Sequence, residues 1–151
     1  MTAFDLEARI GLARAFIGSL PHAQALGLEF VSMGLAEAVL RVPYHPRLVG
    51  DPETGVMHGG VITTLLDTCS GTAVMLHPTN AQITATMDLR IDYMRAAAPG
   101  LAVSARALCY HTTRNVGFVR ATAFEGADET AVVATASGAF IIDRDPREET
   151  S

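Results

Sequence analysis

The sequence predicts an α+β domain in which a mainly antiparallel sheet wraps around one long buried helix. An apolar run with helical spacing occupies residues 59–76, and the pattern changes to strict alternation after Pro78. Turn signals then divide the chain into segments whose connections are too short for parallel crossovers. Because no other predicted element could cover the apolar helix, the sheet must do so.

An amphipathic helix is predicted before this core, over residues 2–20. Thr2 is a candidate N-cap, and Pro21 ends the helix. Its apolar stripe comprises Leu6, Ile10, Ala13 and Ile17. Two strands are expected next, over Leu26–Ser32 and Leu35–Arg41, with a tight turn at Met33-Gly34 between them.

The stretch from Pro43 to Gly55 is rich in Pro, Gly and Asp, which indicates an irregular loop. The buried helix follows at Gly59–Leu76. Four strands are then predicted at 82–93, 101–111, 116–125 and 130–142. We therefore expect one domain over residues 1–143 and a polar, disordered tail over 144–151.

Composition excludes several classes of function. The formal net charge is −5 and no arginine-rich run is present, so a nucleic acid is a poor candidate partner. No window is long enough for a membrane span and no signal peptide is evident, so a cytoplasmic protein is expected. Cys69 and Cys109 fit buried apolar positions better than a disulfide or a metal site. No cofactor or metal motif occurs.

The segment Gly55–Asp67 carries the most chemical information. Two glycines follow His58 at the predicted helix start, where backbone N–H groups have no partner within the helix. Asp67 then interrupts the apolar helix, at a position where a carboxylate loses hydration and needs compensation. Catalysis is one explanation. The alternative is a structural aspartate that accepts hydrogen bonds from Thr63 or Thr64.

These residues resemble a known family. A loop that ends in Gly-x-x-His-Gly-Gly, a helix with an acid nine residues after the histidine, and four following strands are similar to the hotdog-fold acyl-CoA thioesterases of the phenylacetate-pathway and 4-hydroxybenzoyl-CoA type. The strand Thr86–Arg95 adds to the resemblance, which covers about Pro21 to Asp143. The resemblance implies a hotdog fold, assembly as a homodimer or homotetramer, and hydrolysis of an acyl-CoA without a cofactor.

The resemblance also implies a role for each site residue. Asp67 would be the nucleophile or the general base, and the Gly59 N–H would polarise the thioester carbonyl. Thr86 stands where related enzymes place a hydroxyl that holds the water or the acid, although β-propensity also explains a threonine there. His58 would fix the helix start or contact the carbonyl. The family's loop asparagine is absent here, which leaves the second donor to the carbonyl unassigned.

Arginines are the expected contacts for the phosphates of CoA. Arg114, beside Asn115 at a predicted hairpin tip, is the first candidate, because related enzymes use residues near this turn. Arg90 is another. Ordinary solvated surface arginine is the alternative for each.

Helix geometry predicts that the site is shared between subunits. Eight residues separate Gly59 from Asp67, which places their backbones about 12 Å apart along the axis. One carbonyl cannot easily touch both. A two-fold dimer would bring Asp67 of one subunit to Gly59 of the other, and the small stripe Gly60, Thr64, Asp67 and Gly71 permits close approach. Packing of that stripe against the protein's own sheet is the alternative.

Two other functions stay open at this stage. A hotdog hydratase or dehydratase would use a histidine and an acid as an acid/base pair, and His58 and Asp67 are available. A non-catalytic regulator would bind acyl-CoA or lipid without hydrolysis. The sequence does not fix the acyl group, which could be aromatic, medium-chain or long-chain.

Overall fold

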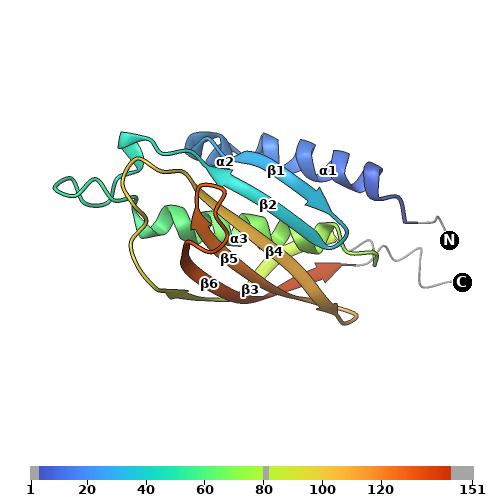
Figure 1. Cartoon of the computed structure of the whole chain (residues 1–151). Helices are drawn as coiled ribbons and strands as arrows, with labels where there is room; N and C mark the ends of the chain where they lie inside the picture. Colours follow the sequence, from blue (N-terminus) through green and yellow to red (C-terminus); the bar gives the residue numbers. More distant parts are fainter. Residues whose placement is uncertain (1–3, 80–81, 144–151) are drawn as a thin grey trace, which may run out of the picture.

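An antiparallel sheet curves around helix α3 (Gly59–Met75) in the computed structural model, which describes residues 4–79 and 82–143 (Figure 1). Across the sheet the strands run in the order β1 (Glu29–Gly34), β2 (Glu37–Val42), β4 (Val103–Thr112), β5 (Val116–Glu125), β6 (Val132–Asp143) and β3 (Gln82–Tyr93). Each neighbouring pair is antiparallel. The predicted architecture is therefore confirmed.

Helix α3 is buried because apolar residues cover more than one of its faces. Residues packed into the core include Val61, Ile62, Leu65, Leu66, Cys69, Ala73 and Val74. The Cys69 thiol donates to the carbonyls of Ala38 and Ala105, both at 3.3 Å, so the helix contacts β2 and β4 directly. Burial raises the pKa of Cys69 to about 12. Both cysteines are buried and free, as the sequence predicts.

The N-terminal segment differs from its prediction in two ways. Helix α1 (Leu6–Ser19) begins where the Asp5 carboxylate accepts from the Ala8 N–H at 3.1 Å, not at residue 2; Thr2 lies outside the described residues. Pro21 ends α1 but also starts a second helix, α2 (Pro21–Leu26). A proline is well suited to the first helical position, because its missing N–H would have no helical partner there.

The first hairpin is also shifted. Its turn lies at Leu35-Ala36 rather than Met33-Gly34, and Ala36 has a positive φ of 57°. Tertiary hydrogen bonds explain the shift: the Ala36 N–H donates to Leu76 O at 2.9 Å, and the Cys109 N–H donates to Ala36 O at 2.8 Å. Packing against α3 and β4 thus decides the turn position, which local sequence does not specify.

A short 3-10 helix, η1 (Pro46–Leu48), occupies part of the predicted irregular loop. Beyond it, Val49 and Met57 form an isolated antiparallel bridge that closes the projecting loop before α3. The His58 N–H donates to Leu48 O at 2.8 Å, which ties η1 to the start of α3. The loop is therefore held in place at both of its ends.

Strand β3 lies at one edge of the sheet and contains a β-bulge that matters for the site. Thr86 pairs with Phe140, whereas Asp88 pairs with the adjacent residue Ala139, so Met87 is the extra residue. The bulge places Thr86 on the same face as Leu89, toward α3. Strict alternation would instead place Thr86 on the outer face with Arg90.

The predicted tail, residues 144–151, lies outside the described residues. Among the described residues, no helix has the length and apolar character needed to cross a membrane.

Candidate active site

The start of α3 is fixed by His58. Its Nδ1 accepts a hydrogen bond from the Gly60 N–H at 2.8 Å, so the imidazole serves as the N-cap of the helix. A Cβ at Gly60 would lie 2.9 Å from this same Nδ1, so the cap requires glycine there. This geometry matches the structural role considered for His58.

The Gly59 N–H is left available by this arrangement. Among the described residues, no hydrogen bond uses the Gly59 N–H as a donor. Gly59 is the first residue of α3 and is exposed, so its N–H lies at the positive end of a seventeen-residue helix. An oxygen that develops negative charge would be stabilised there.

Tyr93 holds the first turn of α3 against the sheet, a contact that the sequence did not reveal. The Tyr93 and Thr63 hydroxyls lie 3.0 Å and 3.2 Å from Gly59 O and bond each other, so one of them donates to the other while its partner donates to Gly59 O. The only signal in the sequence was an aromatic residue at the end of the strand after the helix. Tyr93 therefore connects the end of β3 to the residue that presents the free N–H.

Asp67 lies two turns further along α3 and is half-buried. Thr86 Oγ1 donates to Asp67 Oδ1 at 2.7 Å, which the β3 bulge makes possible. Among the described residues, the other carboxylate oxygen, Oδ2, has no hydrogen-bond partner. A hydroxyl thus orients the carboxylate while one oxygen remains free to accept a proton.

The hydrogen bonds from Thr63 or Thr64 that were considered for a structural Asp67 are not formed. Thr63 Oγ1 bonds Gly59 O and Tyr93, and Thr64 Oγ1 donates to Gly60 O at 3.0 Å. Both hydroxyls are therefore committed to groups other than the Asp67 carboxylate. The donor comes from a distant strand instead.

Two open clefts lie along this side of α3. The cleft beside the carboxylate has a volume of about 440 Å³, and its lining includes Asp67, Thr86 and Leu89. The cleft at the helix start has a volume of about 410 Å³, and its lining includes His58 and Gly60. Both clefts are lined in addition by His22 of α2 and Thr64 of α3. The acid and the helix start therefore face two neighbouring spaces.

The predicted candidates for CoA binding are not gathered in these clefts within one chain. Arg90 is exposed on the outer face of the sheet and pairs with Asp92 at 3.3 Å. Arg114 and Asn115 lie at the β4–β5 turn, which is followed by Gly117. A Cβ at Gly117 would come within 2.9 Å of Val74, near the C-terminal end of α3. The turn and Gly59 are thus at opposite ends of the helix.

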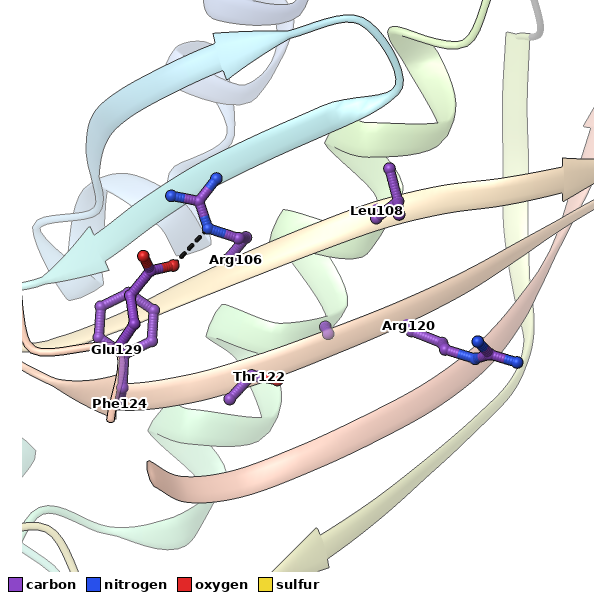
Figure 2. Close-up of a pocket in the computed structure, with 7 residues that line it drawn as sticks. Arg106, Leu108, Arg120, Thr122, Phe124 and Glu129 are labelled. Carbon is purple, nitrogen blue, oxygen red and sulfur yellow. Dashed lines mark hydrogen bonds and ion pairs between the residues drawn. The ribbon is translucent and has the colours of Figure 1, made fainter. Parts of the chain in front are cut away.

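A further pocket, of about 230 Å³, lies on the outer face of the sheet (Figure 2). Its lining includes Arg106, Leu108 and Arg120, and Figure 2 shows Arg106 joined to Glu129. Arg120 is the lining residue that the sequence offers as a contact for the CoA phosphates. Within the described residues, no three His, Cys, Asp or Glu side chains gather as ligands for a metal ion.

The chain belongs to the thioesterase superfamily, whose family model matches residues 54–132. It is 32% identical to a Halobacterium salinarum protein that is provisionally named an esterase. The alignment covers 96% of this chain and 99% of that protein. It is also 33% identical, over 53% of its length, to a Salmonella typhimurium medium/long-chain acyl-CoA thioesterase, of which it spans 60%. The second of these relatives is thus named for hydrolysis of acyl-CoA thioesters, and the first for esterase activity.

Solved structures agree on the fold. A Pseudomonas aeruginosa protein is 41% identical with a TM-score of 0.77, and the alignment covers 91% of this chain and 98% of that one. The Escherichia coli PaaI protein from the phenylacetic acid degradation operon has a TM-score of 0.78 at 21% identity, with 93% and 97% covered. The predicted hotdog thioesterase class is confirmed.

Proposed function

We propose that this protein hydrolyses acyl-CoA thioesters to a carboxylic acid and CoA at sites shared between two copies of the chain. The observation that carries the proposal is the pair of unused groups on one rigid helix: the Gly59 N–H, and the free oxygen of an Asp67 carboxylate held by Thr86. The first suits a developing oxyanion and the second suits a base or nucleophile. The acyl-CoA thioesterase name of relatives supports the same reaction.

The reaction follows from these two groups. The Gly59 N–H binds the thioester carbonyl oxygen, and Asp67 removes a proton from a water molecule whose oxygen attacks the carbonyl carbon. The tetrahedral intermediate collapses, the carbon–sulfur bond breaks, and the thiolate of CoA takes up the proton that Asp67 had accepted from water. In the alternative route, the Asp67 carboxylate itself attacks the carbonyl carbon, the carbon–sulfur bond breaks and CoA leaves as the thiolate, which takes up a proton. Water then hydrolyses the resulting anhydride to the free acid and the Asp67 carboxylate.

A shared site follows from the separation of the two groups. Helix α3 runs without interruption from Gly59 to Met75, so the rise of about 1.5 Å per residue keeps Gly59 and Asp67 about 12 Å apart. Two-fold pairing of α3 helices would place Gly59 of each copy beside Asp67 of the other. Gly60 and Thr64 lie on the side of α3 that lines the clefts, which would permit that approach.

The hydratase alternative gains no support from the site. It needs a histidine that exchanges protons with substrate, and His58 is engaged through Nδ1 as the N-cap of α3, which leaves only Nε2 for such a role. Absorbance change with an enoyl-CoA would distinguish this activity from release of a free thiol.

The test is thiol release across a panel of aromatic, medium-chain and long-chain acyl-CoAs. We expect turnover by the wild type, and a loss of about 10²–10⁴-fold in Asp67→Asn. Asp88→Asn, an equivalent change at an exposed acid of β3, should retain the wild-type rate. Undiminished hydrolysis by Asp67→Asn would refute the assignment. Tight acyl-CoA binding without thiol release would instead indicate a regulatory binder.

A further inference from the structure

The cleft at the start of α3 is lined by basic side chains, whereas the protein as a whole is acidic. Its lining contains Arg47, His22 and His58 and no aspartate or glutamate, although the chain as a whole has a formal net charge of −5. The other lining residues are Gly60, Thr64 and four apolar side chains: Leu26, Leu48, Val49 and Val61. The cleft therefore combines an apolar surface with cationic or hydrogen-bond-donating groups.

Arg47 differs from the other arginines of the described residues in having no partner for its guanidinium. Four others form ion pairs with carboxylates: Arg41, Arg90, Arg95 and Arg106. The Arg9 guanidinium donates to Met75 O, and Arg14 and Arg120 stack on aromatic rings. Arg114 is engaged as well. The exposed Arg47 guanidinium thus retains all of its donors for a ligand.

Hydrogen bonds hold the backbone around Arg47, whereas its guanidinium has no hydrogen-bond partner among the described residues. The Arg47 N–H donates to Nδ1 of His45, the N-cap of η1, at 3.1 Å. The next residue, Leu48, is buried, and its carbonyl accepts from the His58 N–H at 2.8 Å. One hydrogen bond therefore fixes η1 relative to the N-cap of α3, and Arg47 is presented beside the helix start.

We propose that Arg47 binds an anionic group of the substrate, with His22, which lines the same cleft, as a second donor. This inference rests on the proposed acyl-CoA hydrolysis and names a recognition residue for it. The shared chemistry is a planar or tetrahedral set of anionic oxygens, which Arg binds through paired N–H groups. A CoA phosphate supplies such a group, and so does a carboxylate at the far end of an acyl chain.

The experiment compares wild type, Arg47→Gln and Arg47→Lys, with Arg41→Gln as the matched control. Arg41 is a surface arginine of β2 that pairs with Glu29 at 2.9 Å and is not among the residues that line the cleft. Binding of CoA and of pantetheine, which lacks the phosphates, is measured by calorimetry at two salt concentrations. Kinetics are measured with acyl-CoAs that end in a methyl group or in a carboxylate.

If Arg47 binds a CoA phosphate, Arg47→Gln raises the Kd of CoA by about tenfold or more and weakens its salt dependence, with pantetheine unaffected. Arg47→Lys restores part of the affinity, because it keeps the charge but not the paired donors. If Arg47 binds an acyl carboxylate, Arg47→Gln raises the KM only for substrates whose acyl chain ends in a carboxylate. Either result supports the proposal.

The proposal is overturned if Arg47→Gln matches Arg41→Gln in every measurement, or if it weakens pantetheine and CoA equally. The outcome is separable from the proposed function. A wild type that binds CoA through Arg47 but releases no thiol from any acyl-CoA would refute hydrolysis and retain the anion site. If the wild type hydrolyses acyl-CoA and Arg47→Gln has the same kinetics and the same affinity for CoA, only the anion site is refuted.

Discussion

Replacing Gly59 by proline removes one hydrogen-bond donor and little else. Gly59 is the first residue of α3, where proline is accepted, and its N–H has no partner among the described residues. The preceding residue, His58, has φ −60° and ψ 134°, which is the conformation that a following proline requires. A Cβ at Gly59 would meet Tyr93 Cε1 at 3.8 Å, an ordinary contact. The helix should therefore form normally.

The expected kinetic effect follows from the loss of the oxyanion donor. Removal of one such donor typically costs about 2.7–4 kcal/mol of transition-state stabilisation, or roughly 10²–10³-fold in kcat. Folding stability should change by less than about 1 kcal/mol, since no hydrogen bond within the chain is lost. Gly59→Ala supplies the comparison, because it adds the Cβ but keeps the N–H.

The assay is thiol release from an acyl-CoA, with thermal unfolding measured on the same samples. Gly59→Pro should fold with a Tm close to that of wild type and lose most of its kcat, whereas Gly59→Ala keeps most of the activity. Equal activity in Gly59→Pro and wild type would refute the role of this N–H. Equal loss in both variants would show that space, not the donor, matters at this position.

Three further predictions concern other parts of the molecule. Thr86→Val removes the 2.7 Å hydrogen bond to Asp67 and should lower kcat by about 5–30-fold, yet have no further effect in an Asp67→Asn background. The Arg95 guanidinium beside Glu125 holds the pKa of that carboxyl below its usual value, so Glu125→Gln should lower Tm at neutral pH, and the difference should shrink as the pH falls through the lowered pKa, as pH-dependent melting would show. The raised pKa of Cys69, about 12, predicts no labelling by a thiol reagent at pH 8 until denaturant is added.

Sequence patterns predicted the elements whose local signals agree with their tertiary surroundings. Helix α3 was expected at 59–76 and lies at Gly59–Met75, because a continuous apolar pattern and Pro78 define it. Strand β5 matches its predicted range, 116–125, because turn signals flank it. Where tertiary contacts decide, the prediction was wrong: the turn at Ala36 is set by hydrogen bonds to Leu76 and Cys109.

The candidate site was predicted in part. The family motif indicated Gly59, Asp67 and Thr86, but strict strand alternation would place Thr86 on the wrong face of the sheet. Only the bulge at Met87, which no simple pattern marks, brings the hydroxyl to the carboxylate. Neither the anchoring contact of Tyr93 nor the approach of α2 to the clefts is encoded in a local signal, because each depends on packing between distant segments.

The most direct test of the shared site combines two inactive variants. In a mixed dimer of Asp67→Asn and Gly59→Pro, one site would hold both substitutions and the other would hold neither. If chains associate at random, half of the dimers are mixed, so the mixture should recover about one quarter of the wild-type activity. Thiol release is measured after the two variants are unfolded together and refolded, with each variant refolded alone as the control. Recovery near one quarter is the predicted result; activity no higher than that of the separate variants would contradict a site shared between two chains.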